Sequence, residues 1–194
     1  MRILLTIVLT GGVSVAGMAQ TPEVLSVSGK LRYHAERTYS RASIARSGVS
    51  AGWSQMKDSP TEWGKGGDGY SKRLGSSVAS SAIRASLAFG LDSALHQDPR
   101  YYRSGSSGLW PRVKHALRGT ILTRTDSGGE TLSTWRIGSA YGAAFISNQW
   151  YPDRLNTVRH GLVRGSTRLG WDLVNNVLAE FWPDSKKKIS RRKL

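Results

Sequence analysis

Apolar residues recur at intervals of three and four along most of this chain, which is the period of an amphipathic helix. The clearest run extends from Tyr70 to Gln97 and stops at Asp98-Pro99, because a proline disfavours helical geometry in the residue before it. Further helices are predicted at 27–56, 109–123, 132–150 and 154–182. The strict alternation that membrane strands or half-buried strands require is not sustained in any segment. We therefore expect an all-α, single-domain bundle of about five helices without strands.

The apolar positions indicate which face each helix is expected to bury. In the first helix they are Leu31, Ala35, Thr38, Ala42, Ala45, Val49 and Trp53. In the last helix they are Leu155, Val158, Leu162, Leu169, Leu173, Val177 and Phe181. Pro183 follows them and is expected to end that helix. These faces are predicted to pack together as the core.

Small residues four apart form a second pattern within the predicted helices. The stripes consist of Ala82, Ser86, Gly90 and Ala94; of Gly138 and Gly142; and of Gly161 and Gly165. A stripe with so little side chain lets two helix backbones approach closely, so we expect tight crossings inside a bundle. The alternative is that these glycine-striped helices insert into a membrane or form a homo-oligomer. Charged residues within the same helices, such as Arg84 and Asp92, favour the bundle.

Residues 1–19 have the features of a cleavable signal peptide. Arg2 supplies the positive charge, the following run is largely apolar, and the small residues ending at Ala19 suit a signal peptidase. The alternative is a retained membrane anchor, which is disfavoured because about 20 uninterrupted apolar residues are needed to span a bilayer. We expect cleavage after Ala19 and export to the periplasm or envelope.

Composition and charge narrow the choice of partners. The remaining chain, about 175 residues, is long enough for one domain, expected at 20–184. The absence of cysteine excludes disulfides and thiolate metal sites. The chain has 28 Lys and Arg residues and 13 Asp and Glu residues, which gives a net charge of +15. Such a surface attracts anions, and export makes anionic lipid or an envelope polymer a better partner than nucleic acid, which we do not expect.

Part of this charge is concentrated at the C-terminus. The basic residues there are Lys186, Lys187, Lys188, Arg191, Arg192 and Lys193. Residues 185–194 are expected to form a disordered tail. The tail either binds an anionic surface or is simply solvated.

Acidic and basic side chains at the predicted helix ends are the candidates for chemistry. They are His96, Asp98, Arg100, Arg124, Asp126 and Asp153. A histidine and a carboxylate beside an anion-binding arginine would suit phosphoester or acyl hydrolysis. The structural interpretation is favoured: His96 meets the negative end of a helix, Asp98 starts a turn, and Asp126 caps the next element with Arg124 as its ion-pair partner.

No motif indicates a metal or an organic cofactor, and none is expected. The histidines His34, His96, His115 and His160 lack metal-ligand spacing, and a His-Glu-x-x-His motif is absent. Asp126-Ser127-Gly128 has the form of an aspartic-protease triplet, but that chemistry needs two carboxylates and only one such triplet exists.

Several short blocks are richer in aromatic, proline and charged residues than packing requires. They include Trp63-Gly64-Lys65-Gly66, His96-Gln97-Asp98-Pro99-Arg100-Tyr101-Tyr102, Asn148-Gln149-Trp150-Tyr151-Pro152-Asp153-Arg154 and Phe181-Trp182-Pro183-Asp184. As a set, across Ser59 to Asp184, they resemble an exported bacterial protein family known from acidobacterial genomes that has no assigned activity. The resemblance implies a shared fold and export, and it supplies no catalytic residues.

Two functions are compatible with these observations. The first is an exported, non-catalytic helical protein that is held at the cell envelope by basic surfaces. The alternative is a small envelope hydrolase that uses the histidine, aspartate and arginine residues at the helix ends. The arrangement of those residues in space distinguishes the two.

Overall fold

The computed structural model describes residues 23–191, and for 183–191 it describes the backbone alone. Helix accounts for 73% of the structure, which confirms the predicted all-α class. In chain order the α-helices are α1 (Val27–Tyr39), α2 (Arg41–Met56), α3 (Gly66–Ala94), α4 (Leu109–Ile121), α5 (Thr134–Asn148) and α6 (Val158–Arg191). Short 3-10 turns occur at Thr61–Trp63 and Asp153–Leu155, and a hairpin is formed by β1 (Leu122–Arg124) and β2 (Glu130–Leu132). The predicted signal peptide at 1–19 lies outside the described residues.

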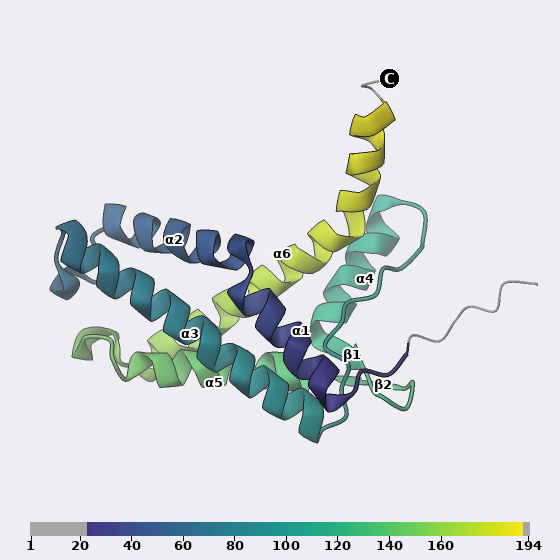
Figure 1. Ribbon diagram of the computed structural model, residues 1–194, viewed down its shortest axis with the longest axis horizontal. Helices are drawn as coiled ribbons and strands as arrows, with labels where there is room; N and C mark the ends of the chain where they lie inside the picture. Colours follow the sequence, from purple (N-terminus) through teal and green to yellow (C-terminus); the bar gives the residue numbers. More distant parts are fainter. Residues whose placement is uncertain (1–22, 192–194) are drawn as a thin grey trace, which may run out of the picture.

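Helices α3 and α5 form the centre of the bundle. They pack against each other, α1 and α2 lie on α3, and α6 packs on α5 and α4. Figure 1 shows α2 running along α3, with α5 on the other side of α3 and the hairpin beside the start of α5. Among the described residues no helix is both long enough and apolar enough to cross a membrane.

The single helix predicted at 27–56 is two helices, because Ser40 interrupts it. Ser40 has an extended backbone (φ −65°, ψ 150°), and it is both the C-cap of α1 and the N-cap of α2. Its hydroxyl accepts a hydrogen bond from the backbone N–H of Ser43 at 3.2 Å. A serine in this position satisfies one of the free N–H groups of the new helix, so the chain turns here.

The prediction that the chain lacks strands is wrong. Leu122 pairs with Leu132 and Arg124 with Glu130 in an antiparallel ladder, and Gly128 takes a positive φ of 90° in the connecting turn. The strands have three residues each, too few to produce a recognisable alternation of apolar and polar positions.

The short glycine stripes do make the close crossings that were predicted. A Cβ on Gly138 would lie 2.8 Å from Leu91, and one on Gly142 would lie 3.0 Å from Leu87, so α3 and α5 approach closely. On α6, a Cβ on Gly161 would lie 2.5 Å from the ring of Phe145. The glycines of α5 and α6 thus make room for large side chains of the helix opposite.

The longer stripe on α3 faces outward, contrary to prediction. Ser86, Gly90 and Ala94 are exposed, and a Cβ on Gly90 would have no neighbour within 4 Å. Because α5 already presents glycines to α3, the facing side of α3 must carry large residues to fill the contact. Leu87 and Leu91 do so.

The end of α6 also differs from the prediction. The helix does not stop at Pro183 and runs to Arg191, so the backbone of 185–191 is helical where a disordered tail was expected. Proline removes one helical hydrogen bond but its fixed φ still fits a helix, so a kink is the usual outcome. Figure 1 shows α6 changing direction before its yellow end. Arg192 and Lys193 lie outside the described residues, and for 183–191 the structure describes the backbone and not the side chains.

Large apolar side chains lie mostly outside this bundle, and small or polar ones lie inside. The buried apolar residues are Ala51, Ala88, Ala116, Trp135, Ala140, Ala143, Ala144 and Leu155. The apolar faces predicted for the first and last helices are therefore partly wrong, since Leu31, Val49, Trp53, Val158 and Leu162 are exposed. The interior is instead completed by buried ionic and amide side chains, among them Lys30, Asp92, Arg136 and Glu180.

Candidate functional site

Most of the predicted site residues meet where the end of α3 lies against the hairpin. The backbone N–H of Asp98 donates to the carbonyl of Arg124, and that of Asp126 donates to the carbonyl of His96, each at 2.8 Å. These bonds bring the loop after α3 to the strand β1 and its turn. Asp153 is not part of this group: it follows α5, whose 15 residues separate it from the hairpin by about 22 Å.

Asp98 is a fully engaged structural carboxylate. Its oxygens accept hydrogen bonds from Arg100 Nη2 and the Tyr102 hydroxyl, both at 2.7 Å, and from the backbone N–H of Arg100 at 2.9 Å. Burial alone would raise the pKa of Asp98, but these hydrogen bonds outweigh it and lower the pKa. The same contact raises the pKa of Tyr102 to about 12, with burial as the larger cause. The Asp98 carboxylate accepts the backbone N–H two residues on, the local contact by which an aspartate fixes a bend of the chain, and it does so as an anion.

Asp126 pairs with Lys30, and not with Arg124 as predicted. Lys30 Nζ lies 2.7 Å from Asp126 Oδ2 and donates a second bond to the carbonyl of Asp92 at 3.1 Å. Only 2% of Lys30 is exposed. Arg124 stacks instead on the ring of Tyr102, with 4.6 Å from its Cζ to the ring centroid. The pair between Lys30 and Asp126 therefore fastens α1 to the hairpin turn.

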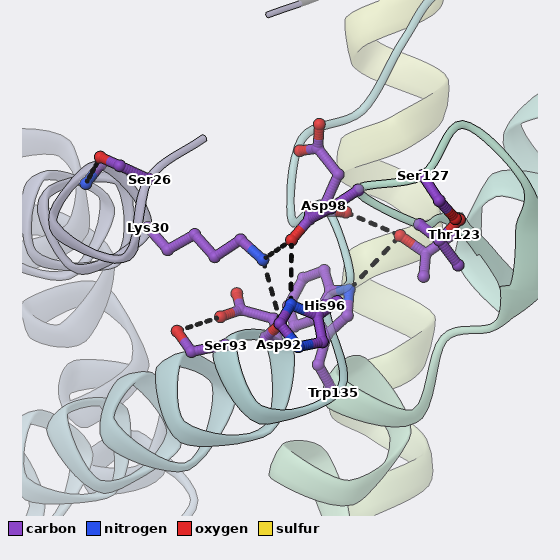
Figure 2. A network of polar contacts seen from close by, with 12 residues as sticks. Ser26, Lys30, Asp92, Ser93, His96, Asp98, Thr123, Ser127 and Trp135 are labelled. Atoms are coloured by element: carbon purple, nitrogen blue, oxygen red, sulfur yellow. Dashed lines mark hydrogen bonds and ion pairs between the residues drawn. The ribbon is translucent and has the colours of Figure 1, made fainter. Parts of the chain in front are cut away.

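His96 is an exposed member of this cluster, as is Arg124. Its side chain is 80% exposed, its Nδ1 lies 3.8 Å from Asp126 Oδ2, and its backbone has a positive φ of 50°. Figure 2 shows Lys30 and His96 converging on one carboxylate, with Asp92 and Trp135 below them. A non-glycine residue with positive φ is strained, and such strain is found at turns and at functional sites.

His34 and Asp92 form a second pair that the sequence analysis did not identify. His34 Nε2 lies 2.5 Å from Asp92 Oδ2, Asp92 is completely buried, and Trp135 packs edge-on against the His34 ring. Lys30 and His34 are four residues apart on α1, so they project from one face. That spacing was the available signal for a polar inner face of α1.

Glu180 is the centre of another buried network that sequence reasoning missed. Its carboxylate accepts hydrogen bonds from the Tyr101 hydroxyl at 2.7 Å and the backbone N–H of Ser104 at 2.8 Å, and Arg112 Nε lies 3.4 Å away. Burial raises the pKa of Glu180, but these donors more than compensate and lower it. The network ties the loop before α4 to α6.

Arginine and carbonyl groups hold the remaining junctions. Arg73 donates to the carbonyls of Pro60 at 2.6 Å and Gly64 at 2.7 Å, which fixes the loop between α2 and α3. Arg84 pairs with Asp172 between α3 and α6. Burial and the nearby Arg84 lower the pKa of Arg168 to about 10.

The chemistry open to the helix-end cluster is limited by these contacts. Asp98 and Asp126 are each neutralised by a bonded cation, which suits a structural anion better than a general base. In the described part of the chain, no group of three histidine or acidic residues is arranged to hold a metal ion.

The outer face of α1 and α2 carries exposed basic side chains, most of them without an acidic partner in the part of the chain that the structure describes. Between 27 and 57 the acidic residue is Glu36, which pairs with Arg32 at 2.6 Å. The other exposed basic residues on the same segment are Arg37, Arg41, Arg46 and Lys57. None of these four has an acidic side chain within ion-pair distance among the residues described.

Comparisons with protein-family models, with curated proteins and with solved structures gave no match for this chain.

Proposed function

We propose that this protein is an exported, non-catalytic helical protein that attaches peripherally to the cell envelope through basic surfaces. Its partner is an anionic lipid or an anionic envelope polymer. The observation that supports this most directly is the basic outer face of α1 and α2, formed by Arg37, Arg41, Arg46 and Lys57. The predicted signal peptide supports export, and the basic residues between Lys186 and Lys193 extend the positive charge.

The distribution of acidic residues strengthens this proposal. Asp92, Asp172 and Glu180 face inward and are satisfied by His34, Arg84 and the Tyr101–Arg112 network. Acids used inside the bundle do not offset basic groups outside it, so the surface of α1 and α2 presents a positive field.

The test is binding of the mature protein to vesicles of phosphatidylglycerol and phosphatidylcholine. Each basic residue near an anionic bilayer contributes about 1 kcal/mol. Replacing Arg41, Arg46 and Lys57 by Gln should therefore weaken binding about 100-fold at low salt. The matched control replaces Arg32, Lys72 and Arg118 by Gln, because these exposed residues lose the same charge but already have acidic partners.

The outcome depends on which triple variant loses affinity. Equal losses would mean that net charge alone governs binding, and no loss in either would contradict the proposal. Deletion of 185–194 measures the contribution of the C-terminal basic residues in the same assay. In cells, a salt wash should release the protein from the membrane fraction.

A hydrolase remains the second candidate, favoured by one observation. His96 is exposed, strained and close to Asp126. If the cluster is catalytic, His96→Ala should abolish hydrolysis of a generic phosphoester or carboxylester and leave the fold unchanged. Absence of hydrolysis by the wild-type protein would argue for the non-catalytic proposal.

A further inference from the structure

The outer face of α2 is apolar as well as basic. Val49 is 75% exposed, Trp53 59% and Met56 80%, and Ala42 and Ala45 are exposed beside them. These five residues are three or four positions apart, so they form one stripe along the helix. From Ala42 to Met56 the stripe is about 21 Å long. We call it the α2 stripe.

The packing of α2 on α3 does not use this stripe. Ser47 and Ala51 are the buried residues of α2, and they lie four apart on its other side. Next to them, a Cβ on Gly48 would lie 3.6 Å from the Tyr70 hydroxyl. Helix α2 is therefore held by small residues, and Val49, Trp53 and Met56 are directed away from the bundle.

Basic side chains border the α2 stripe. Arg46 lies three residues before Val49 and seven before Trp53, which places it along the same side of the helix. Lys57 Nζ lies 4.8 Å from the centroid of the Trp53 ring. Helix α2 contains no acidic residue. Long basic side chains beside an exposed tryptophan are typical of a helix that lies in the headgroup region of an anionic bilayer.

We propose that the α2 stripe inserts into the interface of an anionic phospholipid bilayer, with Val49, Trp53 and Met56 below the headgroups and Arg41, Arg46 and Lys57 among the phosphates. This inference rests on the proposed function and narrows its partner from an anionic surface to a lipid bilayer. An anionic polymer would satisfy the basic groups but would leave the apolar stripe in water. A second copy of this chain would bring two acid-free helices of like charge together.

The absence of cysteine allows the insertion to be measured directly. Val49→Cys carries an environment-sensitive fluorophore on the α2 stripe, and Leu178→Cys carries it on α6 as a matched control at another exposed apolar position. On addition of phosphatidylglycerol–phosphatidylcholine vesicles, the Val49 label should shift to shorter wavelength and be quenched by a lipid-borne quencher. The Leu178 label should not change.

Affinity provides a second readout. Trp53→Gln combined with Val49→Gln keeps every charge, and it should weaken vesicle binding at least tenfold because apolar burial is lost. The control pair, Trp171→Gln with Leu178→Gln on α6, should remain within twofold of wild type. All four side chains are exposed, so the fold should tolerate each change.

The possible results separate this inference from the proposed function. Vesicle binding without a shift of the Val49 label would overturn insertion and leave electrostatic attachment in place. If the α2 double variant binds vesicles as tightly as wild type does, and also binds dextran sulfate as tightly as wild type does, the apolar stripe is not used. That result would identify an anionic polymer as the partner and overturn the lipid assignment. A shift of the Val49 label without vesicles, as protein concentration rises, would assign the stripe to a second copy. Binding to dextran sulfate without any binding to vesicles would overturn insertion and leave the proposed function in place, and no binding to either would overturn both proposals.

Discussion

Gly165 and Gly170 on α6 provide a direct test of how α5 and α6 pack. A Cβ on Gly165 would lie 2.2 Å from Cδ1 of Tyr141 and 2.9 Å from its Cγ, so an alanine there must displace the ring. The same Cβ on Gly170 would have no neighbour within 4 Å. Alanine is more favourable than glycine in a helix by about 1 kcal/mol, and this gain applies at both positions.

The difference between the two variants isolates the packing cost. Overpacking costs about 1–3 kcal/mol, so Gly165→Ala should be less stable than Gly170→Ala by that amount. For a protein of this size, the gap corresponds to about 2–12 °C in Tm. Urea unfolding followed by circular dichroism measures both variants against wild type, and Gly170→Ala should be the more stable of the two. If Gly165→Ala stabilises the protein as much as Gly170→Ala does, then α5 and α6 do not cross where the structure places them.

Three further predictions concern the buried polar contacts. Lys30→Met removes the cation from Asp126. Breaking a buried pair costs about 3–5 kcal/mol and Asp126 keeps some access to water, so we expect the free energy of unfolding in urea to fall by about 3 kcal/mol. Amide exchange should become faster in α1 than in α3, and a uniform increase would contradict the local role. Because the pKa of Asp98 is lowered in the folded protein, its stabilising contribution is complete above its ordinary pKa of about 3.9 and is lost as pH falls through the lower folded value. Asp98→Asn should therefore flatten the acid side of the plot of stability against pH, and an unchanged plot would show that Asp98 is not held as an anion. Arg73→Met removes the guanidinium donor from the carbonyls of Pro60 and Gly64 and should cost at least about 2 kcal/mol. Lys72→Met on the exposed face of the same helix should change stability by less than about 0.5 kcal/mol.

Helix positions could be predicted from this sequence because they depend on local signals. Asp98-Pro99 follows α3 by a few residues, and the glycine-rich turn at 128–129 separates α4 and its strand from α5. Local signals also explain the one missed break, since the serine at position 40 is a strong N-cap within an otherwise helical period. The period itself continues across the break, so it gave no reason to divide the segment.

The direction of each helical face could not be predicted in the same way. Periodicity shows that two faces of a helix differ, and the usual assumption is that the apolar one is buried. In α1 and α2 this assumption fails, because Lys30, His34, Ser47 and Ala51 face the bundle and Val49 and Trp53 face away. Such an inversion requires that each buried polar group has a partner, and those partners are remote: Lys30 and Asp126 are 96 residues apart in the sequence.

The candidate site shows the same division between local and remote information. Asp98, Arg100 and Tyr102 lie within five residues, and the local structural role of Asp98 was predicted. The partner of Asp126 was predicted to be its near neighbour Arg124, but the structure selects Lys30 from another helix. Glu180 was missed because its donors come from the loop before α4 and from α4 itself. A single sequence carries no signal that identifies such partners, because they are far apart along the chain.

The polar interior and the apolar surface of this bundle have a common consequence for function. At the close crossings of α3, α5 and α6, Gly138, Gly142, Gly161 and Gly165 each face one large side chain of the helix opposite. Ion pairs and carbonyl contacts supply much of the specificity of the interior, and many of the tryptophan and aliphatic side chains remain outside. Exposed apolar side chains gain free energy only when something other than this chain covers them. On α2 the neighbouring charges are all positive, so the surface that can cover Val49 and Trp53 without repulsion is one that is apolar beneath and anionic above.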